Sequence, residues 1–131
     1  MKLKIETSKR IELIDITSEV QEEVTKKGFF EGICIISTMH TTAGIITNEN
    51  ESGLKEDLLD LLNNLVPAGA GYRHDRIHHN ADAHLRAVLL GASEALPISS
   101  GKLELGTWQR IFFAEMDGPR NRVVNITVLR T

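Results

Sequence analysis

The chain contains few of the residues that usually reveal a function. Of its 131 residues one is cysteine, and 5% are aromatic. A lone cysteine excludes an intrachain disulfide, and the apolar neighbours of Cys34 in residues 32–37 indicate a core thiol rather than a nucleophile. A protein without disulfides suits a reducing compartment, so we expect a soluble, cytoplasmic protein.

Long apolar runs and long runs of one charge are also missing. No stretch approaches the roughly 20 apolar residues that cross a membrane, and residues 1–6 alternate polar and apolar where a signal peptide needs an apolar block. Lys and Arg number 15 and Asp and Glu 18, a formal net charge of −3. We therefore expect neither membrane nor nucleic acid as a partner. Without a glycine-rich nucleotide loop, side chains and helix termini would have to hold any phosphate.

The length suits one domain spanning residues 1–131. Alternation of apolar and polar residues predicts strands over residues 2–7, 10–16, 103–105, 108–115 and 122–129. Residues 32–37 are apolar at nearly every position, which predicts a central strand covered on both sides. The arrangement indicates the α+β class, with a mixed, largely antiparallel sheet and two to three helices.

Helical periodicity predicts three helices, over residues 18–27, 52–66 and 81–90. Ser18 begins the first with the pattern of a capping box. A stripe of leucines at helical spacing predicts that the second faces the core. Asn80 is placed to cap the third, whose Leu85, Val88 and Leu89 we expect to face inward.

Histidines are the most informative residues present. Four of the five fall within residues 72–84, and the fifth, His40, follows the 32–37 strand. Together with His74 and His84, His40 makes a candidate three-histidine set, the pattern of a catalytic zinc site with an open position. Spacing alone leaves open that these histidines do not share a metal. His78 and His79 are adjacent and point in different directions, so we expect at least one to be a solvated loop residue.

Charged residues near the end of the chain allow two interpretations. Glu115 and either Arg120 or Arg122 would form a simple cross-strand ion pair. Alternatively, the carboxylate and the two guanidinium groups frame an anion pocket, because the planar fork of arginine matches phosphate oxygens. Residues 48–51 likewise allow simple helix capping, although four polar residues exceed what a cap needs.

Several of these stretches together resemble the motifs of the YjbQ-type family, some of whose members are secondary thiamine-phosphate synthases. The matching segments are His40-Thr41-Thr42-Ala43-Gly44, Asn48-Glu49-Asn50, Tyr72-x-His74-Asp75, Asn80-x-x-x-His84-Leu85, residues 101–109 with Gly106-Thr107-Trp108-Gln109, and Glu115-x-Asp117-Gly118-Pro119-Arg120-x-Arg122. The resemblance covers essentially the whole chain. It implies a homotrimer whose polar motifs converge on one pocket.

Candidate roles for individual residues come from the resemblance for the metal site and from side-chain chemistry for the ligand-binding and catalytic residues. His40, His74 and His84 match the histidines of a metal site, with zinc or magnesium as the cofactor. A small phosphorylated ligand would be bound by Thr41, Thr42, Asn48, Arg120 and Arg122. The residues implied in catalysis are Glu49, Asp75, Gln109 and Glu115. Trp108, on the alternate face from Gln109, is expected in the core.

The implied reaction joins a hydroxymethylpyrimidine diphosphate to a thiazole phosphate, giving thiamine phosphate and diphosphate. Two other functions stay open. One is a metal-dependent phosphoester hydrolase with Glu49 or Asp75 as general base. The other is a non-catalytic trimer that binds a metal or a phosphorylated metabolite.

Overall fold

The structure is a computed structural model that describes residues 1–131, with eight strands, three α-helices and one 3-10 turn. In chain order they are β1 Lys2–Glu6, β2 Glu12–Asp15, α1 Thr17–Lys27, β3 Gly32–Ser37, β4 Ala43–Glu49, α2 Ser52–Leu65, η1 Arg73–Arg76, α3 Ala81–Leu90, β5 Ser93–Ser99, β6 Lys102–Leu103, β7 Gln109–Glu115 and β8 Asn121–Arg130. None of the helices combines the length and apolar character needed to cross a membrane.

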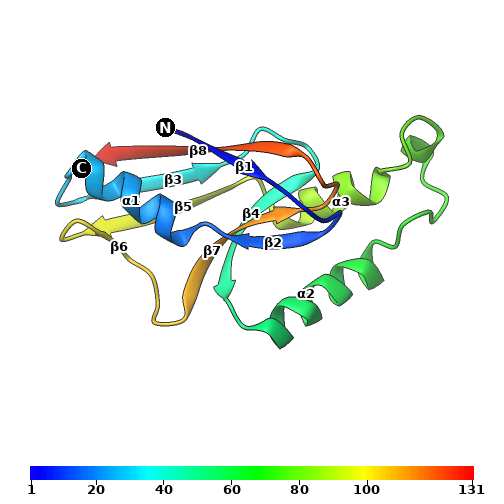
Figure 1. The fold of residues 1–131 in the computed structure, drawn as a ribbon, viewed down its shortest axis with the longest axis horizontal. Coiled ribbons are helices and arrows are strands. Elements are labelled where there is room, and N and C mark those ends of the chain that lie inside the picture. The colour runs from blue at the N-terminus through cyan, green and yellow to red at the C-terminus, as the bar shows by residue number, and fades with distance from the viewer.

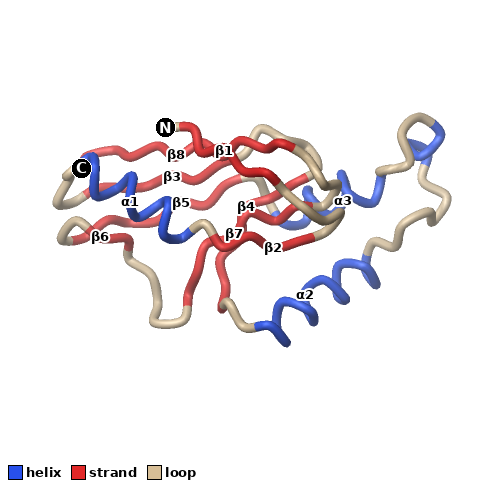
Figure 2. The backbone as a smooth tube through the Cα atoms, in the orientation of Figure 1, coloured by secondary structure: helices blue, strands red, loops and turns tan.

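The strands form two antiparallel sheets, as Figures 1 and 2 show. One has five strands in the order β1-β8-β3-β5-β6, and the other has three in the order β2-β7-β4. The predicted α+β class is confirmed. The expected single, mixed sheet is replaced by two sheets in which all strand pairs are antiparallel.

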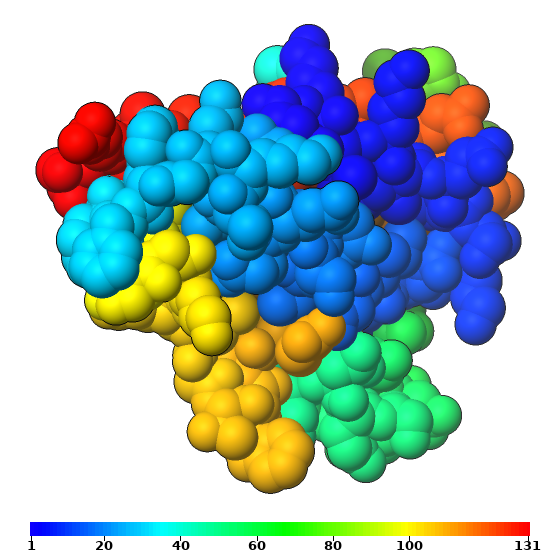
Figure 3. Space-filling view, turned by 60° about the vertical axis from the view of Figure 1, so that its left-hand side comes forward, coloured from blue at the N-terminus to red at the C-terminus, as the bar shows by residue number.

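The sheets and helices pack around two apolar cores. The main core has 14 buried residues and lies among both sheets and α1, whose Val20 and Val24 are fully covered. A smaller core joins Leu62 of α2 and Ala83 of α3 to Ala114 and Met116. In the space-filling view of Figure 3, α1 and the N-terminal segments cover one side of the molecule. The three-stranded sheet therefore has apolar contacts on both faces.

The strand that is buried on both faces is β7, whereas the sequence predicted β3. Residues 111–116 are all buried, because Ile111 and Phe113 join the main core while Ala114 and Met116 join the smaller one. β3 is central in the five-stranded sheet, yet Ile33 is 39% exposed. Cys34 is fully buried on its inner face, and burial raises its pKa to about 11. The interpretation of Cys34 as a core thiol is confirmed.

The helices begin where the sequence predicts, but with different caps. At α1 the N-cap residue is Ile16, and Asp15 accepts hydrogen bonds from the amide and hydroxyl of Thr17, so the capping box predicted at Ser18 is absent. At α3, Asn80 occupies the N-cap position without capping. Its role is taken by Asp75, which accepts from the Ala81 amide.

The predicted inward faces of α2 and α3 are only partly correct. Leu62 is the one buried residue of α2, and Leu61 and Leu65 are more than half exposed. In α3 the expected core residues are exposed instead; they are Leu85, Val88 and Leu89. The helix buries small residues such as Ala83 because it packs close to β4, where a Cβ on Gly44 would lie 2.8 Å from the Leu90 Cβ.

Two further sequence expectations differ from the structure. Trp108, expected in the core, is 71% exposed in the loop between β6 and β7, so that prediction is wrong. β5 was not predicted because it contains Pro97, which lacks the amide of a strand residue. Pro97 lies opposite Ile33, and its carbonyl accepts from the Glu104 amide.

Candidate functional site

His40 lies in the loop between β3 and β4, and an unpaired backbone amide fixes its ring. The pairing of β3 with β8 ends at Ser37 and Asn125. The amide of Val123, two residues earlier on β8, donates instead to His40 Nε2 at 2.9 Å. The imidazole thus accepts the hydrogen bond that a backbone carbonyl of β3 would accept if the two strands paired further.

A shallow polar cavity of about 470 Å³ opens beside His40. It is lined by residues 39–42, by Asn80 and His84 at the start of α3, and by Asp117 and residues 120–122. The structure therefore brings together His40, Thr41, Thr42, His84, Arg120 and Arg122 from the predicted set. Three separate segments contribute to it, which is typical of a ligand site.

A chain of hydrogen bonds runs along one side of this cavity. The guanidinium of Arg120 donates to the Asp117 carboxylate at 3.0 Å, and the Asn80 amide donates to the same oxygen at 2.9 Å. The side-chain carbonyl oxygen of Asn80, Oδ1, lies 3.1 Å from His74 Nε2. His74 is also close to His84, with ring centroids 4.7 Å apart. Half of the Arg120 side chain is exposed, so its remaining donors are accessible to a ligand.

Arg122 is committed to a buried pair with Glu115. Its side chain is 4% exposed and Glu115 is fully buried. The Arg122 Nε donates to Glu115 Oε1 at 2.8 Å, and its Nη2 donates to the other carboxylate oxygen and to the Thr42 hydroxyl. Burial alone would raise the pKa of Glu115, but hydrogen bonds from Arg122, the Asp117 amide and Thr7 lower it. The ion-pair interpretation thus describes Arg122, whereas Arg120 keeps its outer donors.

The same charges act on His40. Burial and the positive charges of Arg122 and Arg120 lower the pKa of His40, opposed in part by Glu115. His40 is therefore held as a neutral ring near pH 7, in agreement with a lone pair on Nε2 that accepts from Val123.

The three histidines do not converge as a metal site in this arrangement. No group of three or more histidine, cysteine, aspartate or glutamate side chains is placed to hold a metal ion. His40 Nε2 is already occupied by the Val123 amide. His74 and His84 lie together and are the part of the set that fits a shared ligand. His78 and His79 are both exposed, which confirms that they are loop residues.

Other predicted site residues lie elsewhere in this chain. Asn48, Glu49 and Gln109 are at the far end of the β4–β7 pair, five or six residues along from Ala43 and Glu115. At about 3.4 Å per residue this is roughly 20 Å from the cavity. There Gln109 donates to Thr47 and accepts from the Gly106 amide. Asp75 caps α3 with its carboxylate.

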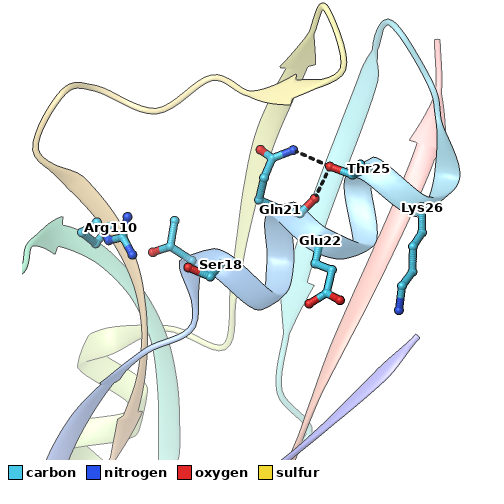
Figure 4. A pocket seen from close by; sticks show the side chains of 7 residues that line it. Ser18, Gln21, Glu22, Thr25, Lys26 and Arg110 are labelled. Carbon is cyan, nitrogen blue, oxygen red and sulfur yellow. Dashed lines mark hydrogen bonds between the residues drawn. The ribbon is translucent and has the colours of Figure 1, made fainter.

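A larger hollow, about 670 Å³, lies along α1 (Figure 4). No hydrophobic residue lines it, and one of its lining residues, Gln21, donates to the Gly101 carbonyl and accepts from the Leu103 amide. Thr25 donates to the Gln21 carbonyl, as the dashed lines show. Because these side chains hold α1 to the β5–β6 turn, we interpret the hollow as a structural groove.

Two residues central to the site were not predicted as site residues. Asn80 and Asp117 connect Arg120 to His74. The sequence contained a signal for each, because Asn80 is one helical turn before His84 and Asp117 shares a turn with Arg120. Their hydrogen bonds to each other join positions 37 residues apart, which spacing alone does not reveal.

Comparisons with known proteins agree over the full length. The family model described as "UPF0047 protein YjbQ-like" matches residues 1–131. A UPF0047 protein of Archaeoglobus fulgidus is 51% identical over 129 residues, covering 98% of this chain and 100% of that protein. The UPF0047 protein YugU of Bacillus subtilis is 40% identical over 131 residues, covering 97% and 96%.

Solved structures show the same fold. A YbjQ-like protein of Sulfolobus solfataricus has a TM-score of 0.98 at 41% identity, covering 100% of this chain and 96% of that one. A YjbQ/UPF0047 protein of Clostridium acetobutylicum has a TM-score of 0.95 at 38% identity, covering 98% and 99%. On these matches, and with the motif residues in place, the chain belongs to the YjbQ/UPF0047 family.

Proposed function

We propose that this chain binds a small phosphorylated molecule in the cavity beside His40 and acts as a transferase of the thiamine-phosphate synthase type. The observation that carries the proposal is the half-exposed guanidinium of Arg120, oriented by Asp117 within a cavity that His40 and Thr41 also line. Charge-assisted donors of this kind suit phosphate oxygens.

The proposed reaction joins a pyrimidine diphosphate to a thiazole phosphate. The bond between the pyrimidinylmethyl carbon and the diphosphate oxygen breaks, and the thiazole nitrogen forms a bond to that carbon. The departing diphosphate keeps the electron pair, so negative charge develops on its oxygens. Arg120 stabilises this charge without reorganisation, because Asp117 already holds it in place. The transfer needs no nucleophilic side chain.

A divalent metal is a separate part of the proposal. We place it only at His74 and His84, because the Val123 amide occupies His40 Nε2. Two imidazoles suit zinc better than magnesium, which prefers oxygen ligands. No step of the proposed transfer depends on this metal.

A homotrimer is proposed as the assembled form. The exposed apolar residues of α2 and α3 support it, because large apolar side chains left exposed on a small protein become buried in an interface. These residues are Leu54, Leu61, Leu65, Leu85, Val88 and Leu89.

The transferase proposal is tested by incubating the protein with the pyrimidine diphosphate and the thiazole phosphate together, and with each alone. Mass spectrometry should detect thiamine phosphate only when both are present, with an equal amount of diphosphate. Arg120→Ala should lower the rate at least about tenfold, whereas Arg110→Ala, paired with Asp15 outside the cavity, serves as the matched control.

Two other results would replace the proposal. Phosphate released from either compound alone would identify a phosphoester hydrolase. Ligand binding without turnover under any of these conditions would identify a non-catalytic binder.

A further inference from the structure

His40 has a fixed proton position because its partner is a backbone amide. A backbone N–H can only donate, so His40 Nε2 must carry a lone pair where it meets Val123. In the neutral ring the proton is then on Nδ1. No side chain or backbone group of the chain hydrogen-bonds to that nitrogen, and His40 lines the cavity. The Nδ1–H of His40 is therefore free to donate to a ligand.

The tautomer of His74 is fixed by Asn80 and Asp117, and it is the opposite of the His40 tautomer. The Asp117 carboxylate can only accept, so the amide nitrogen of Asn80 must face it. This leaves the Asn80 carbonyl oxygen facing His74 Nε2 at 3.1 Å. The Nε2 of His74 must then donate, and in the neutral ring its Nδ1 carries the lone pair.

We infer that the rings of His40 and His74, when neutral, hold opposite tautomers, and that Asp117 is the positioning residue that sets the tautomer of His74 through Asn80. The inference rests on the proposed function for its ligand. His40 donates to a phosphate oxygen of the bound molecule, in the same cavity as Arg120. The ligand thus carries an anionic group toward His40, while His74 lies behind Asn80 and is not among the residues that line the cavity.

Asp117 connects the ligand cavity to His74 through Asn80. Its Oδ2 accepts both from Arg120 and from Asn80. The Asp117 carboxylate therefore orients the Arg120 guanidinium, which is to bind the phosphate. Through the side-chain amide of Asn80, it also determines which ring nitrogen of His74 carries the proton. Replacing Asp117 should affect both Arg120 and His74, while His40 stays fixed by the backbone of β8.

The tautomers are measured by NMR correlation of ring nitrogens and carbon-bound protons in protein with ¹⁵N-labelled histidine. His74→Asn and His40→Asn assign the signals. The wild type should show His40 protonated on Nδ1 and His74 on Nε2. Asp117→Ala frees the Asn80 amide to rotate, so His74 should become a mixture of tautomers. Asp117→Asn keeps an accepting oxygen and should restore the wild-type state, with His40 unchanged in both variants. His40 protonated on Nε2, or His74 unaltered in Asp117→Ala, would overturn the inference.

The ligand half is tested with inorganic diphosphate and two matched variants. An asparagine amide reaches the place of the imidazole Nδ1, whereas a glutamine amide reaches the place of Nε2. If Nδ1–H is the donor, His40→Asn should bind diphosphate within a few-fold of the wild type and His40→Gln at least about tenfold more weakly. The reverse order would contradict the assignment of the donor. If the wild type binds no diphosphate while the tautomers are as stated, the proposed function fails and the ring assignments stand.

Discussion

Loss of the buried ion pair between Glu115 and Arg122 should markedly lower the free energy of unfolding. Glu115→Gln keeps the shape of the side chain but leaves Arg122, 4% exposed, without its counter-charge. Removing one partner of a buried pair costs about 3–5 kcal/mol. The amide oxygen still accepts one hydrogen bond, which favours the lower end, about 3 kcal/mol.

A loss of that size is large for this chain. Small domains unfold with about 5–15 kcal/mol, and at this length a loss of 3 kcal/mol corresponds to a fall in Tm of roughly 10 °C. Chemical unfolding followed by circular dichroism gives the free energy directly. Glu49→Gln is the matched control, because Glu49 lies on the neighbouring strand β4 and is only partly buried. Its change should stay within about 0.5 kcal/mol.

The pH dependence provides a second check with a fixed sign. Burial raises the pKa of Glu115, but the hydrogen bonds from Arg122, the Asp117 amide and Thr7 outweigh burial and lower it. The stability that the ionised carboxylate contributes is thus complete above the unfolded value, about 4.3, and is lost as pH falls through the folded value. The gap between wild type and Glu115→Gln should narrow below about pH 4. Equal unfolding free energies for Glu115→Gln and Glu49→Gln at neutral pH would refute the reasoning.

Four other outcomes are expected from the packing and from the proposals above. Gly44→Ala should lower the unfolding free energy by about 1–3 kcal/mol, because its Cβ would meet α3 at 2.8 Å; an unchanged denaturation midpoint would contradict that close packing. Asp82→Ala should lower the unfolding free energy by about 3–5 kcal/mol in the same assay, because the buried Arg86 loses its counter-charge; a loss under 1 kcal/mol would contradict this role of the ion pair. Zinc occupancy measured by plasma mass spectrometry should fall in His84→Ala and persist in His78→Ala, and full occupancy in the former would exclude His84 as a ligand. Light scattering at micromolar concentration should give three times the chain mass, and a monomer mass would refute the trimer.

Secondary structure was the part of the fold that the sequence predicted best. The periodic segments became β1, β2, α1, α2, α3, β7 and β8 with ends within a few residues. Periodicity does not predict which face of a helix is buried when close packing against a neighbouring element determines that face. α3 buries its alanines together with Asp82 and Arg86, while Leu85, Val88 and Leu89 are exposed. It lies against Gly44, and a sequence pattern does not show how closely two elements approach.

The candidate site was predicted in composition but not in geometry. Residue types and spacing brought attention to His40, His84 and Arg120, which share the cavity. They did not separate Arg120 from Arg122. Only the register places Arg122 inside β8 and against Glu115, while Arg120 stays in the preceding turn. The bond between His40 and Val123 depends on where β3 stops pairing with β8, which is a property of the assembled sheet.

The cavity's affinity for phosphate is the central claim, and calorimetry with inorganic diphosphate tests it most directly. Arg120→Lys keeps the charge but removes the planar fork, and should weaken binding about tenfold or more with a nearly unchanged melting temperature. Arg110→Lys, which makes the corresponding change in the ion pair with Asp15 outside the cavity, should bind diphosphate like the wild type. Unaltered affinity in Arg120→Lys, or equal losses in both variants, would show that the phosphate site lies elsewhere.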